Sequence, residues 1–137
     1  MRRSRKLPAL NFGRLPAELI NQTIGTDLTE ADVIMSYAAQ RHAARRHREY
    51  ASCVPFIAAI ICNPQYIGDD FKNSGIELIG YANSSLGYIL IAVELEVDKL
   101  GRYNVSSVYP VSRSKINNRR TKGFLKIAVK KWGLSDN

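Results

Sequence analysis

The apolar and polar positions of the chain divide it into a helical first half and a sheet-forming second half. Residues 15–25 carry a proline suited to a first turn and end on a glycine, which together favour a helix. The segment "DVIMS" (32–36) predicts a short strand, and the alanine-rich residues 37–48 favour a second helix. The apolar segment 51–64 predicts a buried helix that is closed by an Asn-Pro turn, with Pro55 in its first turn.

The second half is rich in Ile, Val and Tyr. Residues 76–82, 87–97 and 103–111 predict three strands, and the intervening "NSSLG" and "DKLGR" are typical of hairpin turns. Helices that precede an antiparallel meander are the pattern of an α+β fold. We therefore expect one α+β domain over residues 15–132, in which N-terminal helices pack on a C-terminal antiparallel β-meander. We expect residues 1–14 to form a basic flexible arm.

Charge is the strongest feature of the composition. The 137 residues include 20 Lys and Arg against 12 Asp and Glu, a net charge of +8. Such an excess favours an acidic partner, with nucleic acid first and an anionic membrane or acidic protein second. The bases gather in residues 2–6, 41–48 and 113–131, whereas acids dominate residues 66–100. Acids and bases should therefore occupy different faces.

Several features limit the classes of protein that fit. The longest apolar run, residues 54–62, is too short to span a bilayer, and no signal-peptide hydrophobic region follows the basic start. Cys53 and Cys62 would lie too far apart on one helix for a disulfide, and we interpret both as apolar core thiols. The pair Asp69 and Asp70 is better explained by a turn than by a metal site. We expect no membrane partner, no metal and no cofactor.

Both histidines of the chain lie in the segment "RHAARRHREY" (41–50), among four arginines. Imidazole can accept and donate protons near neutral pH, and arginines bind phosphate. On a regular helix His42 and His47 would be about 140° apart, so they meet only if the helix breaks near His47. Zinc is disfavoured because no Cys, Asp or Glu stands at ligand spacing around them. A structural or solvated role for the histidines remains an alternative.

The second candidate segment is "SSVYPVSRSKINNRRTK" (106–122). On a strand, Ser107 and Tyr109 project from the same face, and Pro110 is expected to end that strand. A hydroxyl, a phenol and several cations together make a plausible phosphate site. The alternative is an edge strand followed by an exposed basic loop. The candidate substrate-binding cations of the two segments are Arg45, Arg46, Arg113, Lys115, Arg119, Arg120 and Lys122.

Taken in order, "RHAARRHRE", the apolar helix ending "CNPQYIGDD", the meander and "VSSVYPVSRSKI" resemble the phage-associated branch of the barnase–EndoU–colicin–RelE (BECR) ribonuclease-like superfamily. That branch has a helix of the form H-x-x-x-x-H-P, an Asn-Pro or Asp-Pro turn, and a late strand of the form T-x-Y-P. The resemblance covers roughly residues 30–125. It implies a fold of a helix plus a four-stranded antiparallel sheet, metal-independent RNA cleavage and a phage-borne or toxin-like setting.

Carried over by position, the pattern implies catalytic roles for His42, His47, Ser107 and Tyr109. Two positions depart from it: Arg48 replaces the expected proline, and Ser107 replaces the usual threonine. We favour His47 over His42 as the residue nearest the substrate, because it precedes the stretch where the helix could end.

Two functions therefore stay open. The first is a toxin-like or phage-associated endoribonuclease, in which the 2′-OH attacks the adjacent phosphate and leaves a cyclic phosphate. It would act on RNA in the cytoplasm of the producing or target bacterial cell, with an immunity or antitoxin protein as a further partner. The second is a non-catalytic basic module that binds nucleic acid or inhibits a host protein that handles nucleic acid.

Overall fold

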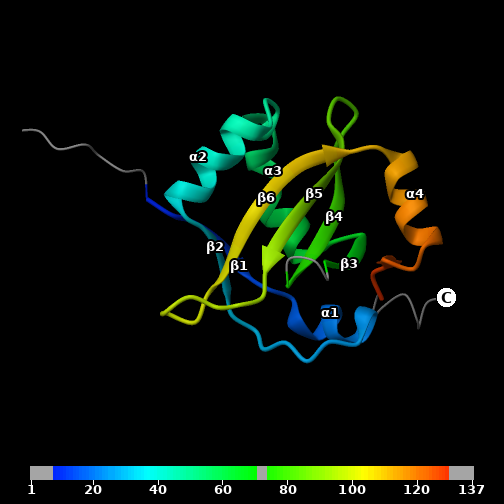
Figure 1. The fold of residues 1–137 in the computed structure, drawn as a ribbon, viewed down its shortest axis with the longest axis horizontal. Coiled ribbons are helices and arrows are strands. Elements are labelled where there is room, and N and C mark those ends of the chain that lie inside the picture. The colour runs from blue at the N-terminus through cyan, green and yellow to red at the C-terminus, as the bar shows by residue number, and fades with distance from the viewer. Residues whose placement is uncertain (1–7, 71–73, 130–137) are drawn as a thin grey trace, which may run out of the picture.

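The computed structural model describes residues 8–70 and 74–129, and in this part of the chain four helices surround one seven-stranded mixed sheet (Figure 1). The helices are α1 (Ala17–Ile24), α2 (Tyr37–Arg46), α3 (Tyr50–Cys62) and α4 (Arg113–Thr121). The strands are β1 (Leu10–Arg14), β2 (Asp32–Met35), β3 (Tyr66–Asp70), β4 (Gly75–Asn83), β5 (Gly87–Glu94), β6 (Tyr103–Val111) and β7 (Leu125–Ile127). The predicted α+β class is confirmed.

The strand order is β1-β2-β6-β5-β4-β3-β7. The strands β3, β4, β5 and β6 form an antiparallel meander, whose last three members are the predicted strands. The sheet is nevertheless mixed, because β2 pairs with β6 in parallel. Helices also occur on both sides of the meander in the sequence, since α4 follows β6. The predicted arrangement of N-terminal helices and a purely antiparallel C-terminal sheet is therefore only partly correct.

Two segments that were predicted to be irregular are strands. Residues 10–14 form β1, which pairs with β2, so this part of the expected arm belongs to the sheet. The four basic residues at positions 2–6 lie outside the described residues. Asp69 and Asp70 are in β3, opposite Ile76 and Gly75 of β4, and not in a turn. Strand β1 depends on a partner about twenty residues away, whereas Asp69 and Asp70 pair with the next strand of a hairpin.

The helices agree with the sequence in position but differ at their ends. Gly25 ends α1 in the left-handed conformation that favours glycine (φ 74°), as predicted. The helix α2 stops at Arg46, two residues earlier than expected. The helix α3 already starts at Tyr50, which places Pro55 inside the helix and not in its first turn.

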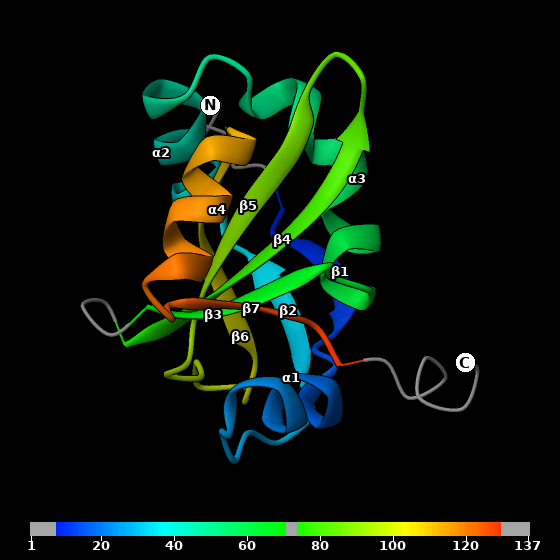
Figure 2. The same ribbon diagram turned by 90° about the vertical axis from the view of Figure 1, so that its right-hand side faces the viewer.

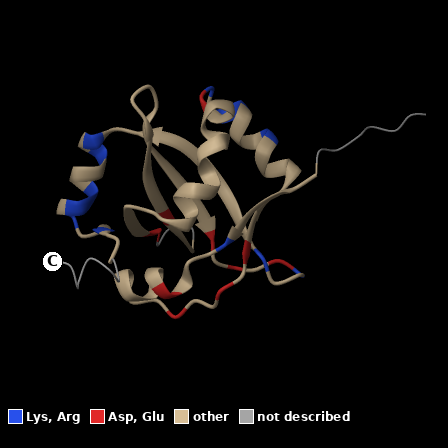
Figure 3. Ribbon diagram, turned by 180° about the vertical axis from the view of Figure 1, so that it is seen from behind, with Lys and Arg blue, Asp and Glu red and all other residues tan. Residues whose placement is uncertain are grey.

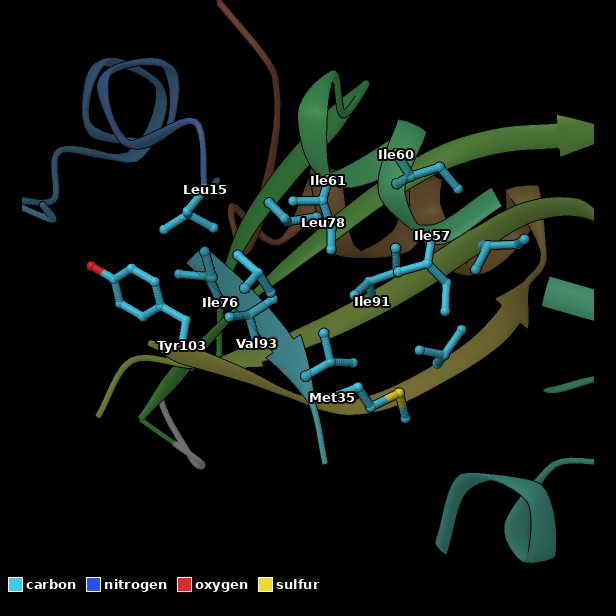
Figure 4. Close-up of a cluster of buried hydrophobic side chains, with 14 of the residues drawn as sticks. Leu15, Met35, Ile57, Ile60, Ile61, Ile76, Leu78, Ile91, Val93 and Tyr103 are labelled. Carbon is cyan, nitrogen blue, oxygen red and sulfur yellow. The ribbon is translucent and has the colours of Figure 1, made fainter. Parts of the chain in front are cut away.

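The two faces of the sheet differ in what covers them (Figure 2). Helix α3 lies on one face, called here the α3 face, where Ile57, Ile60 and Ile61 pack on side chains such as Leu78 and Ile91 (Figure 4). Helix α3 approaches strand β4 closely at Gly80, where an added Cβ would lie 2.9 Å from Ile60 Cγ1. Helix α4 lies on the opposite face, the α4 face, and contributes a single fully buried side chain, Ile116.

The two cysteines on α3 are both free but differ in environment. Cys53 is buried in the core, whereas Cys62 is exposed at the end of the helix. The interpretation of both residues as core thiols is therefore wrong for Cys62, which is the last residue of α3 and lies outside the buried core. Within the described residues, no helix has the length and apolar character needed to cross a membrane.

Candidate functional site

Strand β6 presents Ser107 and Tyr109 on the α4 face. The two residues pair with Ala92 and Leu90 of β5, so they lie two positions apart on the same side of the sheet. The strand spans the predicted residues 103–111, so Pro110 lies within it and does not end it. In the strand order β6 lies between β2 and β5. The predicted shared orientation of the hydroxyl and the phenol is confirmed, because both side chains line the same two hollows.

Helix α2 occupies the flank of β6 that β2 leaves free. Strand β2 pairs with only the first two residues of β6, Tyr103 and Asn104. The chain then turns at Ser36, whose hydroxyl accepts the Ala39 N–H at 3.1 Å and so caps the helix that follows. Helix α2 runs in contact with β6 from there. The short parallel pairing of β2 therefore directs the histidine-bearing helix toward Ser107 and Tyr109.

The helix breaks at His47. His47 is the residue after the last helical turn and has an extended backbone (φ −133°, ψ 111°), while its N–H still bonds to the Ala43 carbonyl. A continuous helix would place the two histidines about 140° apart, whereas with the helix ending here both line one cavity. The His47 ring lies 4.7 Å from the Tyr109 ring, centroid to centroid, at an interplanar angle of 30°.

One cavity of about 510 Å³ collects the predicted catalytic residues. It is lined by His42, Ala43, Arg46, His47, Ser107, Tyr109, Pro110, Val111, Ser112 and Lys115. Helix α2, strand β6 and the segment after it all contribute, although α3 and the strands β3, β4 and β5 separate α2 from β6 in the sequence. The structure thus brings together all four residues that the resemblance selected.

The segment after β6 is a helix, not the exposed loop considered from the sequence. The Ser112 hydroxyl accepts the Lys115 N–H at 3.0 Å and caps α4. The first turn then carries Lys115 over the Tyr109 ring, with its Nζ 5.8 Å from the centroid. Lys115 and Arg46 are therefore the two cations that reach the cavity from opposite sides of Tyr109.

The other candidate cations lie elsewhere. Arg119 forms an ion pair with Glu77, which occupies its guanidinium. Arg113 and Arg120 lie over the rings of Tyr88 and Tyr66, away from the histidines. Arg45 and Lys122 are exposed and do not line the cavity. Of the seven predicted substrate-binding cations, the structure places only Arg46 and Lys115 beside the four candidate catalytic residues.

A second hollow, of about 620 Å³, adjoins the first and shares His42, Ser107 and Tyr109 with it. Its lining includes three acids, Asp70, Glu77 and Glu94. The expectation that the acids of residues 66–100 face away from the basic site is therefore wrong for these three. They belong to β3, β4 and β5, and the strand register places all three on the α4 face of the sheet.

Glu77 is the residue that the sequence analysis missed. It is only 6 % exposed, and it lies in β4 opposite Ala92, which in turn pairs with Ser107. Burial raises the pKa of Glu77 above its ordinary value, although the Arg119 guanidinium opposes the shift. A single carboxylate within the apolar strand "GIELIGYA" was the available signal, since an unpaired buried acid is costly and calls for a partner.

The Tyr109 phenol stays protonated at neutral pH. Burial raises its pKa above the ordinary value, and the nearby Glu77 carboxylate raises it further. A neutral phenol donates a hydrogen bond, which is what a phosphate oxygen accepts. The site therefore combines imidazoles that can exchange protons, two hydroxyls that can donate, and two cations.

Charges are unevenly distributed over the described residues (Figure 3). Lys and Arg mark α4, on the left of that view, and the second half of α2, at the upper right, whereas most acids lie around α1 and the lower ends of the strands, together with a few bases. The cavity with the histidines lies at the basic end, between α2 and α4. Within residues 8–70 and 74–129, no three His, Cys, Asp or Glu side chains are grouped as metal ligands.

Comparison with known proteins gives one match. A family model described as phage-Barnase-EndoU-ColicinE5/D-RelE like nuclease3 (PBECR3) matches residues 11–118. The match includes both histidines, Ser107, Tyr109 and the first half of α4. Neither the curated proteins nor the solved structures provide a match.

Proposed function

Because the chain belongs to the phage-Barnase-EndoU-ColicinE5/D-RelE-like nuclease family, we propose that it is a metal-independent endoribonuclease. The reaction is an attack of the ribose 2′ oxygen on the adjacent phosphorus. The bond from phosphorus to the 5′ oxygen breaks, and the products are a 2′,3′-cyclic phosphate and a 5′-hydroxyl. The observation that carries this proposal is the single cavity shared by His42, His47, Ser107 and Tyr109.

The chemistry needs one group that takes the 2′ proton and one that gives a proton to the 5′ oxygen. His47 and His42 are suited to these two tasks, because both line the cavity from one end of α2. His47 has the more defined position, since its ring packs against Tyr109. We assign it the 2′ proton, and His42 the proton of the leaving oxygen.

The remaining groups stabilise the charge that develops on the phosphate. The Ser107 and Tyr109 hydroxyls donate hydrogen bonds to its non-bridging oxygens. Lys115 and Arg46 supply positive charge from either side, which lowers the energy of the pentavalent transition state. The acids of the second hollow would repel a phosphate, so we place the scissile phosphate in the histidine-lined cavity and not there.

An acidic inhibitor protein is a further proposed partner. The cavity is lined by Arg46 of α2 and Lys115 of α4, and a protein with complementary carboxylates could cover it. A cytoplasmic site of action, where RNA is the accessible substrate, is part of the same proposal. Co-expression that relieves toxicity in a bacterial host would identify such an inhibitor.

The test of the proposed function is the rate of RNA cleavage by His47→Ala, with Arg48→Ala as matched control. Both substitutions lie just past the end of α2, but only His47 lines the cavity. Removal of a general base should lower the rate by about 10²–10⁴-fold, whereas Arg48→Ala should change it by less than about tenfold. Equal rates for the two variants would contradict the proposal.

If the wild type binds RNA but cuts none, the non-catalytic basic module is the correct description. Its binding would then weaken steeply with salt, with a slope of about 0.7 per phosphate neutralised on a single strand. An affinity that does not change with salt would instead indicate a protein partner bound through apolar contacts.

A further inference from the structure

Helix α4 divides its face of the sheet into two sides. Residues 113 and 115 are about 200° apart around the helix, whereas residues 113 and 120 are within about 20° of each other. Lys115 accordingly points to Tyr109 and the histidine-lined cavity. Arg113 and Arg120 point the other way, to a group of tyrosines that the proposed reaction does not use.

That group consists of Tyr66, Tyr81 and Tyr88, called here the tyrosine platform. Strand register places all three on the α4 face, because Tyr81 pairs with Tyr88 and Tyr66 pairs with Ile79. The Tyr88 ring stands edge-on to both neighbours, with centroids 6.1 Å from Tyr66 and 5.3 Å from Tyr81. The rings therefore form one continuous aromatic surface across three neighbouring strands.

An arginine side chain lies over each of the two half-buried rings of the platform, Tyr66 and Tyr88. The Arg113 Cζ lies 5.3 Å from the Tyr88 centroid, and an Arg113 N–H donates to the Tyr88 hydroxyl at 3.2 Å. The Arg120 Cζ lies 5.6 Å from the Tyr66 centroid. Both arginines are exposed, and neither forms a salt bridge with an acid of the described residues. Their charge is available to a ligand.

The platform also retains exposed apolar surface. Tyr81 is 52 % exposed, and Ile127, the cross-strand neighbour of Tyr66, is 56 % exposed. A hollow lined by Asn117, Arg120 and Ile127 lies at the same end of α4. A purely structural cluster would cover its rings, whereas this one leaves the Tyr81 ring exposed beside two exposed arginines.

We propose that the tyrosine platform stacks the bases of single-stranded RNA next to the nucleotide being cleaved. Unpaired bases are recognised by stacking on aromatic rings and arginine planes, with cations along the backbone. With strands about 4.8 Å apart, the three strand spacings from Tyr109 to Tyr66 correspond to roughly 14 Å, which is within reach of neighbouring nucleotides. The proposal rests on the proposed function and adds the form of its substrate: RNA with several consecutive unpaired bases.

The experiment measures binding of a labelled ten-nucleotide single-stranded RNA to the His47→Ala protein at one fixed salt concentration. Tyr88→Leu and Tyr81→Leu each remove a ring but keep apolar bulk. The loss of one stacked base should weaken binding by about 5- to 150-fold. Tyr37→Leu is the matched control, because Tyr37 also lies under an arginine (Arg41 Cζ at 5.7 Å) but on α2. Thermal unfolding of each variant verifies that it folds.

Two results would overturn the proposal: unchanged affinity in both platform variants, or duplex RNA bound as tightly as the single strand. In the catalytically intact protein, Tyr88→Leu should also lower the ratio of kcat/KM for the ten-nucleotide RNA to that for a dinucleotide, which is too short to reach the platform. If the wild type cleaves no RNA, the proposed function is wrong, but the binding measurement still tests whether the platform stacks RNA bases. If the platform variants lose binding to an acidic protein but keep their affinity for RNA, the proposal is also wrong.

Discussion

The two faces of the sheet differ in composition: the α3 face forms the main apolar core, and the α4 face carries the candidate site. The α3 face is covered by Ile57, Ile60 and Ile61 and is apolar throughout its centre. Successive side chains of the same strands point alternately to the two faces. The α4 face carries Glu77, Ser107 and Tyr109, and its apolar cluster around Ile116 is small. Polar groups can be tolerated on one face because the other already supplies a continuous core. The difference indicates that stability and chemistry can be changed separately.

The largest effect on stability should come from the α3 face. Ile57→Ala removes a fully buried side chain and should lower the free energy of unfolding by about 2–5 kcal/mol. The rate of RNA cleavage per folded molecule should not change, because Ile57 lines neither hollow of the candidate site. Urea denaturation and a cleavage assay on the same sample measure both. A large loss of specific rate would mean that the faces are coupled.

Two tyrosines on strand β6, one on each face of the sheet, allow the same change to be compared on both faces. Tyr109→Phe removes a donor to the phosphate and should slow cleavage by about 10²–10³-fold with little change in stability. Tyr103→Phe removes the hydroxyl that donates to the Thr29 carbonyl at 2.6 Å, which should cost about 1 kcal/mol without altering the rate. Parallel assays of the two variants compare one hydroxyl with another on the same strand. If Tyr103→Phe slows cleavage as much as Tyr109→Phe does, the proposed role of the Tyr109 hydroxyl is wrong.

The smallest expected effect concerns the pH dependence of stability. Because burial raises the pKa of Glu77, the folded protein binds this proton more tightly than the unfolded chain does. The free energy of unfolding should therefore fall as the pH rises from about 4.3, by at most about 1.4 kcal/mol per pH unit from this group. Glu77→Gln lacks the titrating group, so its stability relative to the wild type should improve between pH 4 and pH 7. Parallel curves for the two proteins would show that Glu77 does not titrate in this way.

Local sequence was sufficient for the parts of the fold that local forces determine. The strands β4, β5 and β6 were predictable from runs of Ile, Val and Tyr between turn residues, and the histidine-bearing helix from its alanines. Helix α4 was not predictable in the same way, because its stability depends on the Ser112 cap and on one buried residue, Ile116. Its sequence otherwise resembles a charged loop.

The candidate site shows the same limit. The residues His42, His47, Ser107 and Tyr109 were selected by motif, but their meeting depends on the parallel pairing of β2 with β6 and on the helix break at His47. Neither feature has a local signature, since residue 48 is Arg where the motif has proline. The position of Glu77 near Ser107 likewise follows from strand register, because both residues pair with Ala92 of the strand between them.

The proposed function requires the α4 face to cleave RNA by proton transfer without a metal. Incubation of the wild-type protein with single-stranded RNA in excess EDTA, followed by identification of the product ends, tests this requirement. We expect undiminished cleavage, with a 2′,3′-cyclic phosphate, or the monophosphate formed by its hydrolysis, at one end and a 5′-hydroxyl at the other. Loss of cleavage in EDTA, or products that carry a 5′-phosphate, would contradict it.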